Sequence, residues 1–336
     1  MYKIRWKRVL ALSCAAGLLI LLLRGCAIAK RPEPMDAAKL RTEPYADQTI
    51  AVFDGDAARA EERSLETYLV GVVAAEMPAS FDEQALRAQA VAARTYTVYR
   101  AGRGGCNAHD ADVCTSSGCC QAFASEQALR TRWGDAYDEN LERVAAAVRD
   151  TNGQVLCYEG KPIEALYHSA SGGYTEDSEN VFAAAVPYLR AVESEQEIGS
   201  SHLSGTVSLS YAAFCDRVNA ACPDAKLRPD NLADQIEIIG RTESGRVTSI
   251  RLGGASLSGK ALRKLLSLDS TLFTLTLTGG SIRFDTRGYG HGVGMSQTGA
   301  NAMGQAGYSY EQILLHYYTG TTLQNISELT GRADGG

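Results

Sequence analysis

The glutamate at position 76 is placed where acid–base chemistry is possible. Apolar residues recur at intervals of three and four through residues 65–75, which predicts a helix with one apolar face. Glu76 continues that face, whose members are Leu65, Tyr68, Leu69, Val72, Val73 and Glu76. Burial and the negative end of the helix dipole both raise a carboxyl pKa, as a general acid requires. A glutamate that caps or pairs within the fold would show the same spacing, so both interpretations stand.

Arg94 is a candidate partner for Glu76, or for a carboxylate or acetamido group of a substrate. It lies in a second predicted helix at residues 81–100, where many alanines permit the close approach of a neighbouring helix. Ser80 and Glu83 have the spacing of a capping box at the start of that helix. A structural or solvated arginine would fit the same position.

Two further segments are candidates for ligand contact. Residues 287–297 have glycine at every second position from 288 to 294, which frees the backbone to bring His291, Ser296 and Gln297 against a ligand. The segment lacks the Gly-Lys-Ser/Thr ending of a phosphate-binding loop. Residues 169–175 offer small side chains suited to carbohydrate hydrogen bonding or to an ordinary turn. Their candidate residues are Ser169, Ser171, Gly172, Gly173 and Thr175.

A cluster of soft ligands predicts either a zinc site or a disulfide. His109, Cys114, Cys119 and Cys120 lie within twelve residues. Nitrogen and sulfur ligands suit Zn²⁺, although the spacing is not that of a standard zinc finger. Spacing alone leaves zinc and a disulfide within the cluster about equally favoured. Cys215 and Cys222 are the most natural local pair elsewhere, if the chain lies outside the cytoplasm.

The remaining pattern predicts an α+β fold of mixed helices and mostly antiparallel hairpins. The expected hairpins pair 154–158 with 161–167, 235–241 with 247–252, and 273–278 with 282–286. Further helices are expected at 139–149, after Ser258, and at 310–318, where Ser309 and Gln312 mark the start.

The N-terminus predicts export and a membrane anchor. Four basic residues precede the apolar run Val9–Leu23, which orients the N-terminus toward the cytoplasm. Because no clean cleavage site follows, we expect an uncleaved anchor. A cleaved signal peptide is the alternative, and Cys26 resembles a lipoprotein cysteine only weakly. The expected parts are a basic N-terminus (1–8), an anchor (9–29), a linker (30–47), a catalytic region (48–325) and a flexible tail (326–336).

The charge distribution argues against nucleic-acid binding. The chain has a net charge of −6, but residues 1–31 hold seven basic residues and no acid. The remainder therefore carries 26 basic and 39 acidic residues. A body this acidic is poorly suited to neutralising phosphates.

Several motifs together resemble the stage II sporulation protein D family. Residues 72–78 (VVAAEMP) and 83–95 (EQALRAQAVAART) resemble its signature, and 169–175 and 288–300 resemble its two later motifs. The match runs in order from about residue 48 to 325. The resemblance implies a lytic transglycosylase that thins peptidoglycan during engulfment in sporulation, with a glycan-binding cleft between two lobes. Glu76 would be its catalytic glutamate and Arg94 an active-site arginine.

The same resemblance implies a cofactor, a location and partners. It favours zinc in the His109–Cys120 loop, close to the catalytic glutamate, with Cys119, Cys120 or both as ligands. The chain would lie at the sporulation septum or engulfing membrane and act on glycan strands stripped of stem peptides by an amidase. The rival hypotheses are a non-catalytic module that binds glycan and enhances an amidase, and a zinc hydrolase, which would need an open metal position.

Overall fold

The computed structural model describes residues 48–182, 184–194, 197 and 203–330. The predicted N-terminus, anchor and linker lie outside these residues. No helix of the described part is long and apolar enough to span a membrane. Residues 326–330 form helix α12 (Ile326–Thr330), so the expected tail is helical where it begins.

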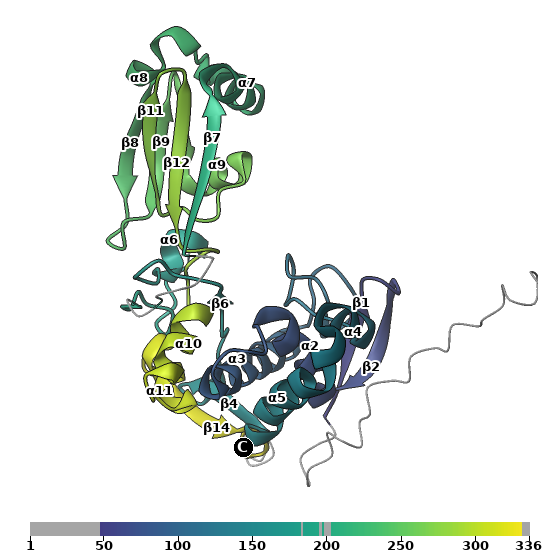
Figure 1. Cartoon of the computed structure of the whole chain (residues 1–336). Helices are drawn as coiled ribbons and strands as arrows, with labels where there is room; N and C mark the ends of the chain where they lie inside the picture. Colours follow the sequence, from purple (N-terminus) through teal and green to yellow (C-terminus); the bar gives the residue numbers. More distant parts are fainter. Residues whose placement is uncertain (1–47, 183, 195–196, 198–202, 331–336) are drawn as a thin grey trace, which may run out of the picture. The chain divides into compact units, whose positions relative to one another are not determined.

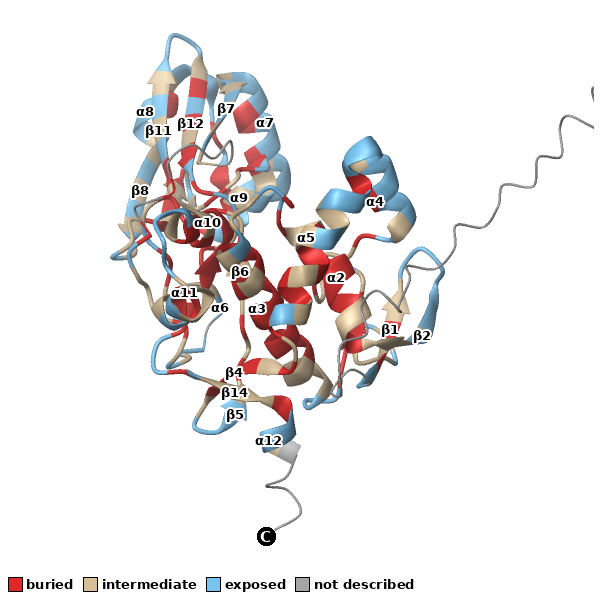
Figure 2. Ribbon diagram, turned by 60° about the horizontal axis from the view of Figure 1, so that its bottom comes forward, coloured by how far each residue is buried: buried red, intermediate tan, exposed pale blue. Residues whose placement is uncertain are grey.

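Two adjacent helices supply most of the buried surface around Glu76. They are α2 (Leu65–Glu76) and α3 (Glu83–Ala101), which pack against each other and against α5 (Tyr137–Asp150) (Figure 1). Figure 2 shows that α2 and α3 are buried along most of their length. The alanines of α3 leave room for these neighbours, as the sequence predicted. Fully burying a side chain such as Leu69 or Leu86 stabilises the fold by about 1.5–3 kcal/mol.

Short strands and helices surround this pair. Strands β1 (Thr49–Asp54), β2 (Arg59–Ser64) and β3 (Val113–Cys114) form one sheet, in which β3 runs parallel to β1. A second sheet joins β4 (Gln154–Tyr158), β5 (Lys161–Pro162) and β14 (Thr322–Asn325). Helices α10 (Gln297–Gln305) and α11 (Tyr310–Tyr317) contact α3, and α4 (Glu126–Trp133) and η1 (Gly134–Ala136) contact α5. A further short helix is α6 (Ser178–Phe182).

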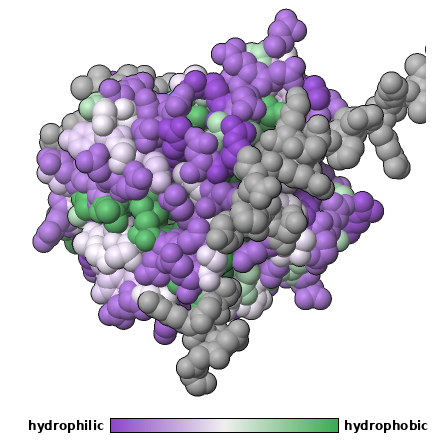
Figure 3. Space-filling model, turned by 90° about the horizontal axis from the view of Figure 1, so that it is seen from below, coloured by the Kyte–Doolittle hydropathy of each residue, from purple (hydrophilic) through white to green (hydrophobic). Residues whose placement is uncertain are grey.

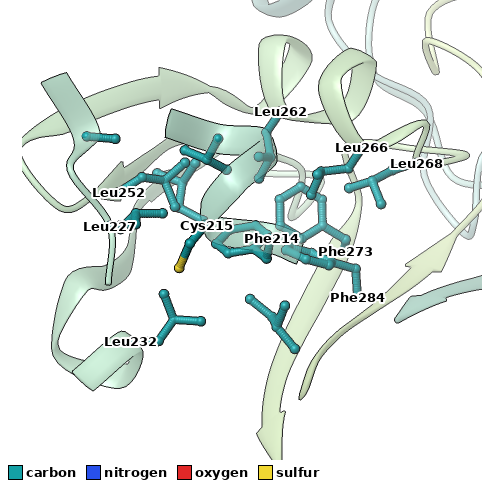
Figure 4. Close-up of a cluster of buried hydrophobic side chains, with 14 of the residues drawn as sticks. Phe214, Cys215, Leu227, Leu232, Leu252, Leu262, Leu266, Leu268, Phe273 and Phe284 are labelled. Atoms are coloured by element: carbon teal, nitrogen blue, oxygen red, sulfur yellow. The ribbon is translucent and has the colours of Figure 1, made fainter. Parts of the chain in front are cut away.

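The segment 204–287 is rich in strands and has its own core. One sheet has the order β10-β9-β8 and the other β11-β12-β7. The elements are β7 (Ser204–Ser210), α7 (Tyr211–Ala221), η2 (Pro223–Ala225), η3 (Pro229–Asn231), α8 (Leu232–Gln235), β8 (Ile236–Arg241), β9 (Val247–Leu252), β10 (Ala255–Ser258), α9 (Gly259–Leu266), β11 (Phe273–Thr278) and β12 (Ser281–Arg287). Phe214, Phe273 and Phe284 meet at the centre of the core (Figure 4). Cys215 lies in this core with a free thiol, and Cys222 is also free, so the predicted disulfide is absent from the structure.

The predicted α+β class is confirmed, and most strand pairs are antiparallel. The three expected hairpins form, although β5 ends at Pro162 and Tyr167 belongs to another strand. The capping box at Ser309 and Gln312 is present. The one predicted at Ser80 and Glu83 is wrong, because Asp82 caps α3 by accepting a hydrogen bond from Gln84 N. The two-lobed arrangement stays a prediction.

The exposed large apolar side chains are scattered through the described chain. They are Tyr174, Phe182, Ile239, Tyr289, Tyr308 and Leu315. Figure 3 shows one mainly hydrophilic face with separate smaller hydrophobic areas. Single exposed apolar residues are normal on soluble domains and do not by themselves mark an interface.

Candidate active site

Glu76 is the last residue of α2 and lines a cleft of about 800 Å³. The cleft combines polar groups with aromatic side chains, as ligand sites commonly do. Its polar lining includes Ser169, Glu197, Gln297, Arg132, Asn140 and Asn301, and its aromatic residues are Phe81 and Trp133. The cleft is large enough for a ligand of several sugar units or a drug-sized molecule, since such sites measure roughly 300–1,000 Å³.

The Glu76 carboxyl group is partly buried and accepts hydrogen bonds from two directions. Its Oε1 accepts from the backbone N–H of Ala122 at 2.8 Å, and its Oε2 accepts from Gln297 Nε2 at 3.3 Å. Burial raises the pKa of Glu76, and the hydrogen bonds from Ala122 and Gln297 oppose that effect only in part. The group therefore holds its proton to a higher pH than an ordinary glutamate, as predicted for a general acid.

A glycine inside α2 lets the loop that carries Ala122 come close. A Cβ on Gly71 would lie only 2.3 Å from the ring of Phe123, so a larger residue would push this ring away. The backbone N–H of Ala124 also donates to Gly71 O. These contacts fix residues 122–124 against α2 and aim the Ala122 N–H at the carboxyl group.

A pair of short parallel strands brings the opposite wall of the cleft to Glu76. Strand β13 (Met295–Ser296) pairs with β6 (Tyr167–His168), with Met295 beside Tyr167. Gly294, with φ of +73°, makes this possible, because a Cβ there would lie 2.0 Å from Leu166 O. Gln297 follows β13 directly and so reaches Glu76. The Tyr167 hydroxyl donates to Gln121 Oε1 at 2.8 Å, which ties this wall to the loop before Ala122.

Glu197 is a second carboxylate in the cleft, but other residues of the chain already donate hydrogen bonds to both of its oxygens. Its Oε1 accepts from Ser171 N, Ser171 Oγ, Ser194 Oγ and Ser296 Oγ, and its Oε2 accepts from Gly172 N, at 2.5–3.0 Å. A carboxylate held by five donors has little capacity left to act as a nucleophile or base. Glu197 instead joins the segment 169–175 to Ser296 at the start of α10.

The predicted ligand-contact residues therefore divide into two groups. Ser169 and Gln297 line the cleft beside Glu76. The others do not line it: Ser171, Gly172 and Ser296 bind Glu197, Gly173 donates its N–H to Ser171 Oγ, and Thr175 Oγ1 accepts from Val192 N. Their hydroxyl and N–H groups form hydrogen bonds with other residues of the chain. These residues therefore support the wall of the cleft without facing into it.

Arg94 takes the structural role that the sequence left open as an alternative to the active-site role. The side chain is fully buried and binds Glu66, with Nε donating to Oε1 at 2.8 Å and Nη2 to Oε2 at 2.6 Å. It also donates to Val148 O and Gln154 O. Arg94 does not line the cleft, and its pairing with Glu76 or a substrate is corrected to a structural ion pair that joins α2, α3 and the end of α5.

Four cysteines meet in the loop before Ala122. The Sγ atoms of Cys106, Cys114, Cys119 and Cys120 all lie within 4.8 Å of one another. Two of these S···S distances are 3.4 and 3.9 Å. Tetrahedral zinc with Zn–S bonds of ~2.3 Å needs sulfurs about 3.8 Å apart, so these residues fit the ion.

The cluster of thiols differs from the predicted zinc ligands by one residue. His109 stacks on Phe53 with ring centroids 3.6 Å apart and is not in the group of thiols, whereas Cys106 is. The sequence interpretation missed Cys106 because it lies three residues before His109, outside the compact run that suggested the site. All four thiols are free in the structure, without a disulfide among them.

His291 lies away from the Glu76 cleft, in a separate cavity. Its Nδ1 accepts from Val293 N at 3.1 Å, and its ring stands edge-on to Phe182. Burial lowers the pKa of His291 to about 4, so the imidazole is neutral near pH 7. The glycine-rich loop does bring His291 to a cavity, but a different one from that predicted.

Several cleft residues carried no usable signal in the sequence. Glu197 stands in a stretch without periodicity, and Trp133 belongs to α4, which was not predicted. Tyr167 was assigned to a hairpin strand and instead pairs with β13. The only sequence signal for contact between the segments 167–175 and 295–297 was the order of the family motifs.

Comparison with known proteins is consistent with this architecture. A family model described as "Stage II sporulation protein" matches residues 54–158, which include α2, α3 and the cysteine loop. Stage II sporulation protein D of Bacillus subtilis (strain 168) is 34% identical over 298 residues, covering 88% of this chain and 84% of that protein. Its counterpart in Bacillus amyloliquefaciens is 34% identical, with 92% of this chain and 90% of that protein covered. The chain belongs to the stage II sporulation protein D family.

A further relative carries a different name. The amidase enhancer of Bacillus subtilis (strain 168) is 29% identical over 302 residues, which cover 76% of this chain and 40% of that protein. The shared region thus occurs both in proteins named for sporulation and in one named for its effect on an amidase.

Proposed function

We propose that this protein is a lytic transglycosylase that cleaves the MurNAc–GlcNAc bond of peptidoglycan in cell-wall remodelling during sporulation. The observation that carries the proposal is the carboxyl group of Glu76, which has a raised pKa and lines the same cleft as Trp133, whereas the hydrogen bonds of Glu197, the other carboxylate in that cleft, are taken up within the chain. Family membership supports the sporulation role, and the relative named amidase enhancer supports a role at the cell wall.

The chemistry needs one carboxyl group that acts twice. Protonated Glu76 gives its proton to the glycosidic oxygen as the bond from MurNAc C1 breaks. The resulting carboxylate then takes the proton of the C6 hydroxyl of the same sugar, whose oxygen bonds to C1 and closes a 1,6-anhydro ring. Glu76 ends protonated, as it began. The intramolecular hydroxyl replaces a water nucleophile, whereas an ordinary glycosidase needs a second functional carboxylate. Glu197, held by five donors, is unsuited to that second role.

We also propose a structural zinc ion on Cys106, Cys114, Cys119 and Cys120. Four thiolates fill a tetrahedral shell, so the ion would stiffen the loop that ends at Ala122 and leave no open position. This ligand set disfavours the zinc-hydrolase hypothesis.

Product analysis tests the enzyme proposal. Purified protein is incubated with glycan strands from which an amidase has removed the stem peptides, and the products are examined by mass spectrometry. We expect saccharides with 1,6-anhydro ends. Products with reducing ends would indicate hydrolysis instead.

The alternative function is a glycan-binding enhancer of a peptidoglycan amidase, which the similarity to the amidase enhancer favours. Under it, the protein binds the same strands without cutting them, and it raises the rate of peptide release when an amidase is added. The two functions are separated by assaying intact peptidoglycan with the amidase alone, this protein alone, and both together.

A further inference from the structure

A second cavity lies apart from the Glu76 cleft and has a markedly basic lining. Its volume is about 180 Å³, and it is bounded by α6, by α9 (Gly259–Leu266), by the β8–β9 connection and by His291. Three cationic side chains line it, namely Arg246, Lys260 and Arg263. Glu176 is the one acidic residue among the lining residues.

The carboxylate of Glu176 already accepts hydrogen bonds from several groups. Its Oε2 accepts from the hydroxyls of Thr242 and Ser244 at 2.6 Å, and its Oε1 accepts from Asp177 N and Asn180 Nδ2. It lies 3.9 Å from Arg246 Nε, a contact too long for a hydrogen bond. Glu197 and Asp269, which do not line the cavity, also attract Arg246 and Arg263 respectively, so these two cations are partly balanced from outside the cavity while the lining itself stays positive.

Arg246 is the most informative of the cations because it is almost fully buried. Its Nη1 donates to Ser270 Oγ at 2.8 Å and its Nη2 to Ser171 O at 2.7 Å. Its Nε is buried without a hydrogen-bond partner among the described residues. This nitrogen is closed off from the cavity and faces Glu176, so Arg246 contributes its positive charge to the cavity wall and not a free donor.

The other two cations extend the basic surface toward the solvent. Within the described residues neither Lys260 nor Arg263 forms a salt bridge. The Lys260 ammonium lies 5.9 Å from the ring centroid of Phe182, and the Arg263 Nε donates to Leu268 O. Both stand on α9, and the N-terminal end of a helix adds further attraction for an anion.

We propose that this cavity binds a small organic carboxylate. Three cationic side chains around one small cavity favour an anion, and the apolar surfaces of Val181, Phe182 and Val247 suit a short aliphatic group beside the charge. The cavity is smaller than the roughly 300–1,000 Å³ of sites for drug-sized ligands, so it suits a group the size of lactate or alanine.

This assignment rests on the proposed function for its natural ligand. Peptidoglycan carries such carboxylates in two places. One is the lactyl group of a muramic acid that has lost its stem peptide, and the other is the C-terminus of a stem peptide. Both present a carboxylate on a carbon that bears a methyl group, so one site can recognise the shared chemistry.

Binding measurements with matched probes test the proposal. The full-length protein, purified in mild detergent, is titrated calorimetrically with N-acetylmuramic acid against N-acetylglucosamine, and with N-acetyl-D-alanine against its amide. We expect the two carboxylates to bind and the two neutral partners not to bind. Binding of the muramic acid alone identifies the glycan source, and binding of the alanine derivative alone identifies the peptide source.

Variants place the binding in this cavity. The double variant Lys260→Gln/Arg263→Gln should lose at least tenfold in affinity, whereas Lys264→Gln, an exposed lysine on the same helix outside the cavity, should bind as wild type does. If the double variant fails to melt cooperatively, Thr248→Glu, an exposed lining residue, places a negative charge there and should cause the same loss. Carboxylates that bind no better than their neutral partners, or equally well to wild type and to the folded cavity variant, overturn the proposal.

The same preparations separate this proposal from the enzyme function. Wild type that makes anhydro-ended products but binds neither carboxylate leaves the enzyme function standing and removes the carboxylate site. Wild type that binds carboxylate but makes no such products keeps the site and removes the transglycosylase function.

Discussion

The backbone N–H of Ala122 donates a 2.8 Å hydrogen bond to Oε1 of Glu76, and Ala122 follows Cys120 by two residues. The four-cysteine cluster and the proposed acid are thus joined through two residues of chain. Glu76 also belongs to a helix whose Gly71 accommodates the ring of Phe123 from the same loop. A metal ion that holds this loop in place would therefore also hold the hydrogen-bond donor of Glu76 in place. Zinc binding is thus expected to affect the proposed acid as well as the stability of the loop.

We predict one zinc ion per chain, bound by Cys106, Cys114, Cys119 and Cys120. Metal analysis of protein purified without metal-affinity resin should give a ratio near one. Cys106→Ser should lower both the zinc content and the melting temperature, because a closed thiolate site contributes directly to folding.

Two control variants distinguish this ligand set from the predicted one. His109→Ala and Cys222→Ser should keep full zinc, since neither residue belongs to the cluster. Loss of zinc in His109→Ala would show that His109 is a zinc ligand, as the sequence predicted. Clearly substoichiometric zinc in the wild type, or a mapped disulfide among the four cysteines, would remove the site.

We predict that Arg94 acts on stability and not on the chemical step. Its partner Glu66 and the carbonyls of Val148 and Gln154 would all lose a buried donor in Arg94→Gln, which should lower the free energy of unfolding by about 3–5 kcal/mol. Arg87→Gln is the matched control on α3. Its half-buried pair with Asp150 should contribute only about 0–1 kcal/mol.

Chemical denaturation measures both effects. If the Arg94→Gln protein unfolds at the wild-type denaturant concentration and yet fails to cleave glycan, Arg94 takes part in the chemical step and not only in stability.

The contrast between Glu76 and Arg94 shows what the sequence determines. The 3.6-residue period placed Glu76 correctly on a buried face, because burial on a single helix is a local property. The partner of Arg94 depends on which side of α3 faces α2, and Glu66 and Glu76 are both on α2, ten residues apart. Sequence spacing offered no means of choosing between them.

Strand pairing shows the same limit for residues that are far apart in the sequence. Hairpins such as β8–β9 and β11–β12 were predictable because a short turn fixes their pairing. The pairing of β6 with β13 joins residues more than a hundred positions apart through two ladder positions, and no local pattern encodes it. The same holds for Glu197, whose donors come from three separate segments.

We predict that the cleavage rate falls as pH rises through the pKa of Glu76. The chemistry needs the protonated form, and burial raises this pKa above the usual value of 4.5. The rate should therefore persist to a higher pH than an ordinary glutamate would allow, and then fall about tenfold per unit. A pH–rate profile of kcat/KM on peptide-free strands measures this. A rate that rises through the same range would identify a general base in place of an acid.

Stability should show the corresponding effect with a definite sign. A carboxyl whose pKa is higher in the folded state binds its proton more tightly there than in the unfolded chain. The stability that comes from this tighter proton binding is therefore fully present below pH 4.5 and is lost as pH rises from there through the folded-state pKa. Burial also raises the pKa of Glu164, so the wild-type curve alone is ambiguous. The difference between wild type and Glu76→Gln isolates the contribution of Glu76.

Glu76→Gln should abolish glycan cleavage and leave the fold intact. Glutamine has nearly the same shape and can still accept from Ala122 N, but it cannot transfer a proton. The loss of rate should be at least the ~10²–10⁴-fold attributed to general acid catalysis, and larger because the same group would also serve as the base. Stability near pH 7 should be equal or slightly higher, since a neutral amide replaces a partly buried carboxyl group. Glu237→Gln, an exposed glutamate in β8, is the control for the loss of one charge.

The decisive comparison uses wild type, Glu76→Gln and Glu237→Gln on the same peptide-free strands, with thermal melts beside the product assay. We expect anhydro-ended products from wild type and Glu237→Gln and none from Glu76→Gln, with all three proteins melting normally. A Glu76→Gln protein that still produces these ends at the wild-type rate would show that another group is the acid. If neither wild type nor Glu76→Gln cuts the strands, yet both bind them and accelerate an added amidase equally, the enhancer function replaces the enzyme. In that case the partly buried carboxyl of Glu76 serves the architecture of the cleft, because its removal would leave both binding and amidase stimulation unchanged.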